Sequence, residues 1–133
     1  MKRKYITTLL IITFFILVSF FSMNFNKQSK IIGKTYIANL GETCKDGIGT
    51  LHKYRVLQFD KDSVIISHKI TAHVNSSELK ILYEHMFDNL TEKHKWEISK
   101  GKIIIQKFYE FNNLEIKEKK IITEKIEFTE QRK

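Results

Sequence analysis

An alternation of apolar and polar side chains between Ser63 and Val74, "SVIISHKITAHV", limits the possible folds more than any other feature of the chain. One face of an extended segment would carry Val64, Ile66, His68, Ile70, Ala72 and Val74. The other face would be dominated by Ser63, Ser67, Lys69, Thr71 and His73. A period of two residues is typical of a β-strand with one buried and one solvated face. The segment therefore predicts a sheet that must cover one apolar face.

The neighbouring segments predict further antiparallel strands. "LHKYRVLQF" ends at the polar turn Asp60-Lys61-Asp62, and "KWEISKGKIIIQKFYEF" divides into two extended runs around Ser99-Lys100-Gly101. Further on, Asn112-Asn113 interrupts the pattern, "LEI" is short, residues 117–120 form a charged turn, and "KIITEKIEFT" reads as one closing strand. With at most one helix to cover it, such a sheet must curl on itself. We therefore expect a mainly β fold, an antiparallel meander of six or seven strands that closes into a small barrel.

One segment favours a helix instead. In "NSSELKILYEHMFDNLTEKH", Asn75 and Glu78 have the spacing of a capping box. The apolar residues Leu79, Leu82, Tyr83, Met86 and Leu90 recur at helical spacing. We predict a helix over Ser76–Leu90 that packs on the sheet or closes one barrel end. A pair of strands, and an apolar stripe that binds a partner, are the alternatives.

The N-terminal segment predicts a membrane signal or anchor over residues 1–26, followed by one extracytoplasmic domain over 27–133. Lys2, Arg3 and Lys4 precede an uncharged, mostly apolar run from Tyr5 to Phe25. At about 1.5 Å per residue this run can cross a hydrocarbon layer of ~30 Å. An A-x-A-like cleavage site is not evident, since Phe20 occupies the position that would pair with Ser22. An uncleaved anchor is therefore favoured over a cleaved signal.

The positive end of this segment should remain in the cytoplasm. The absence of proline and the abundance of Ile, Lys and Asn are typical of AT-rich bacterial genes. The expected location is the bacterial cell envelope. The domain would be anchored in the inner membrane facing the periplasm or the exterior, or secreted if the leader is removed.

Two glycine motifs resemble nucleotide-binding loops but lack required residues. Gly33-Lys34-Thr35 matches the end of a P-loop, yet Gln28 stands where the first glycine belongs. In "GIGTLH", His52 stands at the third glycine of a dinucleotide fingerprint. Gly47 and Gly49 are better interpreted as turn glycines.

Charge and cysteine content exclude further classes. The chain carries a net charge of +8, and its basic residues alternate with Glu along "LEIKEKKIITEKIEF", so we expect no nucleic-acid partner. The single cysteine, Cys44, excludes an internal disulfide and is interpreted as an inert loop residue. The five histidines show neither the i, i+2 nor the i, i+4 spacing of a zinc site. No serine has the context of a nucleophile, so we predict no enzymatic activity, no metal and no cofactor.

Gly33-Lys34-Thr35-Tyr36, at the start of the first expected strand and ahead of a run of hairpins, resembles the start of a lipocalin-like barrel. Proteins of that family open with Gly-x-Trp, whereas here Thr35 occupies the Trp position and Tyr36 follows it. The resemblance covers Ile31 to Thr129 and extends to small exported bacterial proteins of unknown function. It implies an up-and-down barrel around a small apolar ligand.

Within such a barrel the ligand would lie inside the sheet. The candidate ligand-binding residues are Tyr36, His68, Ile70, Trp96, Phe108 and Glu124, with Val56, Ile66 and Phe128 as further wall residues. His68 and Glu124 both have inward parity and could form a polar floor. The alternatives are that His68 is a hydrogen-bonded core residue and that Glu124 lies at a wet barrel end.

Three classes of protein remain open on the sequence alone. The first is a membrane-anchored or exported barrel that binds a small apolar or amphipathic ligand. The second is an envelope interaction protein with a solid core. The third is an α+β, cystatin-like domain in which an open sheet grips the helix.

Overall fold

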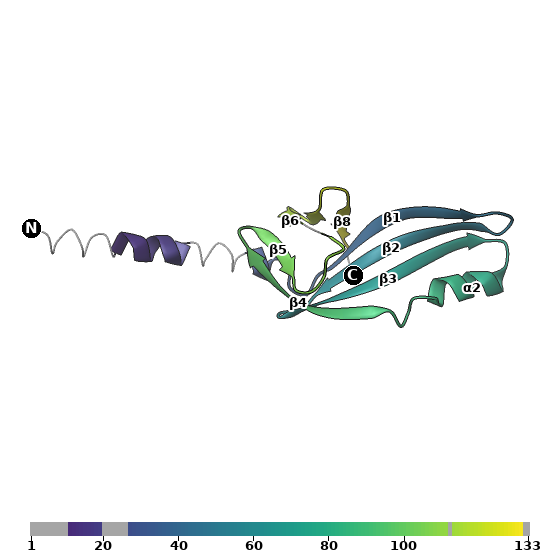
Figure 1. Ribbon diagram of the computed structural model, residues 1–133, viewed down its shortest axis with the longest axis horizontal. Coiled ribbons are helices and arrows are strands. Elements are labelled where there is room, and N and C mark those ends of the chain that lie inside the picture. The colour runs from purple at the N-terminus through teal and green to yellow at the C-terminus, as the bar shows by residue number, and fades with distance from the viewer. Residues whose placement is uncertain (1–10, 20–26, 112, 132–133) are drawn as a thin grey trace, which may run out of the picture.

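The computed structural model describes residues 11–19, 27–111 and 113–131, and it is mainly β (Figure 1). Eight antiparallel strands follow one another around a closed barrel in chain order, which confirms the predicted fold class. The strands are β1 (Thr35–Lys45), β2 (Gly49–Phe59), β3 (Ser63–Val74), β4 (Thr91–Ser99), β5 (Lys102–Ile105), β6 (Leu114–Lys117), β7 (Lys120–Ile122) and β8 (Glu127–Glu130). A short helix, α2 (Ser77–His85), connects β3 to β4. The open-sheet, cystatin-like alternative is therefore wrong.

A short seam between β1 and β8 closes the barrel. Only Tyr36 and Ile37 of β1 pair with β8, opposite Glu130 and Thr129. The backbone N–H of Gln131 extends the seam by donating to the carbonyl of Thr35, at 2.8 Å. The Lys34 ammonium lies 3.0 Å from the Glu130 carboxylate and joins the two strand ends. The lysine of the P-loop-like motif is thus part of the barrel closure.

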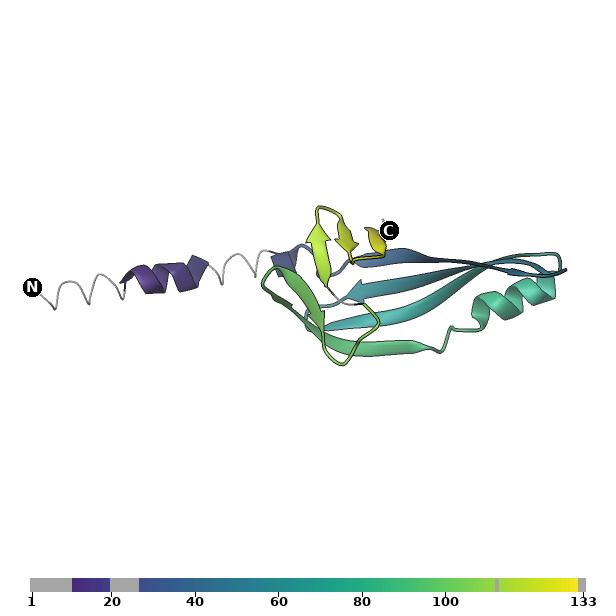
Figure 2. The ribbon, with the colours of Figure 1, turned by 45° about the horizontal axis from the view of Figure 1, so that its top comes forward.

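The first three strands are much longer than the other five, and their far halves extend beyond the barrel (Figures 1 and 2). β3 pairs with β4 only over Ser63–Ser67, whereas it pairs with β2 along its whole length. We call the projecting part, residues 39–45, 49–55 and 68–74, the ribbon. Gly47 and Gly49, at φ 72° and 138°, lie at its β1–β2 turn, as expected for turn glycines.

The barrel interior is filled by apolar and aromatic side chains. Tyr36 packs edge-on against Phe59 with ring centroids 5.9 Å apart, and Phe59 packs against Trp96 at 4.9 Å. Phe128 packs against Phe111 at 5.2 Å. The buried core consists of Ile31, Tyr36, Ala38, Leu57, Phe59, Val64, Ile66, Trp96, Ile103, Ile105, Phe111, Leu114, Ile121 and Phe128. The alternation predicted for β3 is confirmed, since Val64 and Ile66 face this core.

The helix differs from the prediction in its bounds and in its packing. It is capped by Ser76, whose hydroxyl accepts a bond from the Leu79 N–H at 3.3 Å, and not by Asn75. It ends at His85 instead of Leu90, and none of its residues is buried. Tyr83 of the helix and Phe87, two residues beyond its end, pack on a small second core of the ribbon, formed by Leu51, Ile70 and Ala72.

The predicted apolar stripe of the helix is only partly used. Because a single short helix lies on one face of the ribbon, the side chains that point away from that face have no cover. At least half of each side chain is exposed for Ile81, Leu82, Met86 and Leu90.

The C-terminal segment is a hairpin and not one strand. The Thr123 hydroxyl accepts bonds from the N–H groups of Lys125 and Ile126, and it thereby turns the chain between β7 and β8. This turn breaks the period-two pattern that placed Glu124 inside the barrel. The domain consequently has eight strands instead of six or seven.

The N-terminal apolar segment is only partly described. Residues 11–19 form a helix whose side chains are all exposed. The remainder of the predicted signal or anchor, residues 1–10 and 20–26, lies outside the described residues. Within the part of the chain that the structure describes, no helix has the length and apolar character needed to cross a membrane.

The packed interior makes a quantitative prediction about stability. Phe59 is fully buried between Tyr36 and Trp96, so Phe59→Ala should lower the free energy of unfolding by about 3–5 kcal/mol. Tyr109 is 83% exposed, and Tyr109→Ala should change the free energy of unfolding by less than about 0.5 kcal/mol. Urea unfolding followed by the fluorescence of Trp96 measures both. Equal effects of the two substitutions would contradict a filled barrel.

Candidate binding site at the barrel mouth

The apolar interior ends at a charged residue where the barrel opens toward the ribbon. Alternation along β2 points Arg55 to the same face as Leu57 and Phe59, and its register partner on β3 is His68. Arg55 is only 6% exposed, and it is the one buried charged residue in the described part of the chain. Its position marks the mouth of the barrel.

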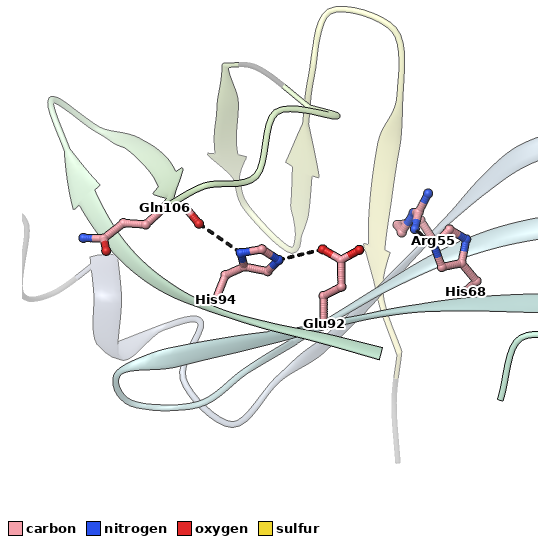
Figure 3. A network of polar contacts seen from close by, with 5 residues as sticks. All are labelled: Arg55, His68, Glu92, His94 and Gln106. Atoms are coloured by element: carbon pink, nitrogen blue, oxygen red, sulfur yellow. Dashed lines mark hydrogen bonds and ion pairs between the residues drawn. The ribbon is translucent and has the colours of Figure 1, made fainter. Parts of the chain in front are cut away.

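Arg55 is held by two side chains from different parts of the chain, of which Figure 3 shows His68. One terminal nitrogen contacts Nε2 of His68, and the other donates to the carboxylate of Glu110 in the β5–β6 connection. The guanidinium carbon lies 5.9 Å from the centre of the Phe111 ring, within the range of a cation–π contact. The remaining nitrogen, Nε, is buried and has no hydrogen-bond partner among the described residues.

The environment of His68 favours its neutral form. Burial lowers the pKa of His68, and the positive charge of Arg55 lowers it further, while Glu110 and Glu92 act in the opposite direction. A neutral imidazole can accept a hydrogen bond from Arg55 at Nε2, which a protonated ring cannot. The Phe87 ring lies 5.6 Å from His68 and covers it on the side of α2.

Two cavities meet at this point. The first, which we call the mouth cavity, has a volume of about 200 Å³ and is lined by Leu40, Lys53, Tyr54, Arg55, His68, Lys69, Ile70 and Phe87. The second, which we call the edge groove, has a volume of about 600 Å³ and is lined by Val56, Ser67, His68, Lys69, Ile70, Thr71, Glu84, His85, Phe87, Asp88 and Thr91. They share His68, Lys69, Ile70 and Phe87, so both open beside the place where β3 separates from β4 and meets α2.

The mouth cavity combines positive charge with apolar walls. Arg55 and Lys53 have inward parity on β2, and Lys53 forms no ion pair with any described residue. Leu40, Ile70 and Phe87 supply the apolar surface. Such a surface can hold a small molecule that carries both a negative group and an apolar body.

The residues predicted to bind a ligand are distributed over three environments. His68 and Ile70 line both cavities. Tyr36 and Trp96 belong to the packed core, where the Trp96 indole donates to the Asp60 carbonyl at 2.9 Å. Burial, followed by the charge of Glu130, raises the pKa of Tyr36 to about 12. Ile66 and Phe128 are core residues as well.

Phe108 and Glu124 lie elsewhere. Phe108 is half-buried between His94 and Phe111, with ring centroids 5.5 and 5.8 Å away. Glu124 is exposed in the turn between β7 and β8, where it accepts a bond from the Asn113 amide at 3.1 Å. It does not form a polar floor with His68, whose partner is Arg55. Glu124 is exposed to solvent, as its alternative interpretation required.

Sequence reasoning missed Arg55, Glu110 and Phe87. A signal for Arg55 was present, because it shares its parity on "LHKYRVLQF" with Leu51, Leu57 and Phe59. No local pattern marks Glu110, since it reaches Arg55 from 55 positions further along the chain. Phe87 lies beyond the end of α2, where helical spacing no longer determines its direction.

A second polar network connects β4 to the residue that follows β5 (Figure 3). His94 contacts the Glu92 carboxylate at 2.8 Å through Nε2 and the Gln106 carbonyl at 3.0 Å through Nδ1. It thereby fixes the start of the connection that carries Glu110. The described residues contain no group of three or more His, Cys, Asp or Glu side chains that could hold a metal ion.

Comparisons with protein-family models, with curated proteins and with solved structures found no match. The closed eight-stranded meander is consistent with a lipocalin-like barrel.

The depressed pKa of His68 predicts a dependence of stability on pH. The unfolded chain takes up a proton near the ordinary value of 6.5, whereas the folded chain does so only at lower pH, so protonation favours unfolding. The free energy of unfolding should therefore fall as the pH drops below about 6.5, and His68→Asn should reduce this loss. Chemical unfolding of both proteins between pH 7.5 and 5.5 measures how the free energy of unfolding depends on pH.

His85 provides a control of opposite sign. A hydrogen bond to the Asp88 carboxylate raises the pKa of His85, so its contribution to stability is present below pH 6.5 and is lost as the pH rises through the raised value. His85→Asn should leave the acid-side loss in place. A His68→Asn variant with an unchanged pH profile would contradict the assigned role of His68.

Proposed function

We propose that the protein is a non-enzymatic binding module, a lipocalin-like barrel held at the outer face of the bacterial cytoplasmic membrane, and that it binds a small amphipathic anion at the barrel mouth. The observation that carries the proposal is the mouth cavity, in which the buried cation Arg55 faces apolar walls. The ligand would lie beside the interior of the barrel and not within it.

The filled interior supports this placement. Leu57, Phe59, Val64, Ile121 and Phe128 have no exposed surface, and native interiors packed in this way leave few voids larger than a water molecule. A ligand in the centre would have to displace several of these side chains. The mouth cavity already has volume for a short acyl chain or a single ring.

The charge distribution supports an anionic head group. Glu110 already pairs with the Arg55 guanidinium, but its buried Nε–H has no acceptor among the described residues, and a buried donor in that condition carries an energetic cost that a bound acceptor would relieve. Lys53 adds a second positive charge at the same face. Carboxylates and phosphates are the anionic groups that a guanidinium recognises best.

The N-terminal helix supports attachment to a membrane. Residues 11–19 include seven large apolar side chains, each 46–65% exposed: Ile11, Ile12, Phe14, Phe15, Ile16, Leu17 and Val18. A helix that is apolar on all sides is stable only when it is surrounded by other apolar groups, such as lipid. The basic residues Lys2, Arg3 and Lys4 favour an orientation with the domain outside the cytoplasm.

A titration with simple amphiphiles tests the ligand. Hexanoate and octanoate should bind saturably and shift the amide resonances of Arg55, His68 and Ile70, whereas hexanol should bind at least about tenfold more weakly, since it lacks the charge. Lys53→Gln should weaken binding of the carboxylates, and Lys45→Gln at the ribbon tip serves as the matched control. Equal binding of acid and alcohol, or shifts centred on Trp96, would contradict a site at the mouth.

Alkaline carbonate extraction of cells that express the full chain tests the attachment. The protein should remain in the membrane pellet, and replacement of Phe15 and Leu17 by Asp should release it, because charged residues in a hydrocarbon layer cost about 2.5–3.5 kcal/mol each. N-terminal sequencing of the mature protein provides the control. A mature chain that starts after residue 22 and is found in the soluble fraction would show a cleaved signal instead.

The exposed apolar side chains of α2 and of the residues that follow it favour a second candidate function, that of an interaction protein with a solid core. Ile81, Leu82, Met86 and Leu90 would then contact another envelope protein. Replacement of Leu82 and Met86 by Ser would abolish that function without loss of stability, and no amphiphile would bind at the mouth.

A further inference from the structure

The outer edge of β3 is left open over a short stretch. Its pairing with β4 ends at Ser67, opposite Thr91. Beyond that point no other strand of the described chain pairs with this edge. The edge is covered again at Ala72, whose backbone N–H donates to the carboxylate of Glu84 on α2 at 3.1 Å.

The bond from Ala72 to Glu84 shows in which direction the neighbouring backbone groups point. In an antiparallel ladder, alternate residues direct their N–H and C=O groups toward the same neighbour. Because the N–H of Ala72 points away from β2, the N–H and C=O of Ile70 point to the open edge as well. Neither group has a hydrogen-bond partner, either backbone or side chain, in the described part of the chain. An unpaired edge of this kind is a template for an additional strand.

The edge groove runs along this unpaired stretch. Its lining includes five consecutive residues of β3, from Ser67 to Thr71, together with Glu84 and His85 of α2 and Phe87 and Asp88 just after it. The open positions 68–71 span roughly 13 Å at about 3.3 Å per residue. The groove, with a volume of about 600 Å³, is therefore long enough for a short strand. The unpaired stretch ends at β4 on one side and at Glu84 on the other.

We propose that the edge groove binds a short extended segment of another polypeptide, which adds to β3 as an antiparallel strand and pairs with the N–H and C=O of Ile70. Recognition of this kind takes its affinity from main-chain hydrogen bonds and its specificity from alternate side chains. The occupant is a peptide with an apolar residue directed at Ile70 and Phe87.

The positive charge of Lys69 favours an acidic residue in the peptide, next to the apolar residue that contacts Ile70. Lys69 is exposed on the face opposite to that of Ile70, and it forms no ion pair with any described residue. A cross-strand neighbour of Lys69 is best stabilised when it is acidic. The occupant therefore alternates apolar and acidic residues.

The dimensions of the gap favour a foreign segment over a second copy of this chain. β3 has 12 residues, and a second β3 laid along the first would meet β4 at one end of the gap and α2 at the other. A segment of about four residues, which turns outward at both ends, meets neither.

Nuclear magnetic resonance with a designed probe tests the proposal. The probe is the capped peptide Ser-Ile-Asp-Ile-Ser, added to the full-length protein labelled with nitrogen-15 in detergent micelles. The free protein should exchange the Ile70 amide hydrogen rapidly. The peptide should shift the resonances of Ser67–Thr71, Glu84 and Phe87 and slow the exchange of Ile70 at least tenfold.

Methylated peptides provide matched controls. Methylation of the backbone nitrogens of the two Ile residues removes the donors that face β3 and should abolish binding. Methylation of the Asp nitrogen, which points away from β3, should leave binding intact. Lys69→Glu should weaken binding of the Asp peptide about fivefold, the equivalent of ~1 kcal/mol, whereas Lys45→Glu should have no effect.

Each contrary outcome overturns the proposal. Equal binding of all methylated peptides, or no shift along β3 at millimolar peptide, would show that the edge does not accept a strand. Protection of Ile70 in the free protein that rises with protein concentration would identify a second copy as the occupant. Shifts restricted to Leu40, Lys53 and Arg55 would place the peptide in the mouth cavity instead.

Discussion

The whole domain depends on the closure of one sheet, and that closure is made by a short seam. Two residue pairs join β1 to β8, supported by the Gln131 amide and by the ion pair between Lys34 and Glu130. Closure pairs the first strand of the meander with the last and directs the inward side chains of the barrel to its main core, while the ribbon keeps a small core of its own. The fully buried Tyr36, which stands in this seam, contacts Phe59 and joins the closure directly to the packed interior.

The unequal lengths of the strands create the mouth. Because β1, β2 and β3 continue where β4 and β8 stop, the apolar face of the sheet extends past the barrel and needs another cover. Two connections provide it: α2 with Phe87 on one side, and the β5–β6 connection with Glu110 and Phe111 on the other. Arg55 and its partners His68 and Glu110 lie between these two connections, and the two cavities open beside them. Both proposed binding activities thus arise from one geometric feature.

The architecture was largely predictable because a single period of two residues determines it. The alternation in β3 defines the inward face of the strand, and Val64, Ile66, Ile70 and Ala72 are buried on that face. The helix was predictable in kind, although its cap and its end were not, because Ser76 and Asn75 are equally suitable capping residues and Phe87 is fixed by packing on the ribbon. The single closing strand that was predicted is two strands, β7 and β8, because the Thr123 side chain makes a turn between them. Alternation of apolar and polar residues does not indicate such a turn.

The site was less predictable than the fold, since its residues come together only through long-range contacts. His68 and Ile70, which were predicted to bind a ligand, do line a cavity, because the face to which each points is a local property of the strand. Glu124 was considered as one possible partner of His68, but β3 is in register with β2, and this register places Arg55 opposite His68. The assumption of an empty interior, which came from the lipocalin-like resemblance, also placed Tyr36 and Trp96 at a ligand, whereas both fill the core.

The length of the ribbon has a consequence for reach. β1 runs for 11 residues, which at about 3.3 Å per residue amounts to roughly 35 Å between the barrel seam and the β1–β2 turn. The chain enters the domain at the seam end, next to the buried Ile31, while α2 lies along the opposite end (Figure 2). A molecule bound beside α2, as proposed above, would therefore lie at the far end of the three long strands from the point where the chain enters the domain.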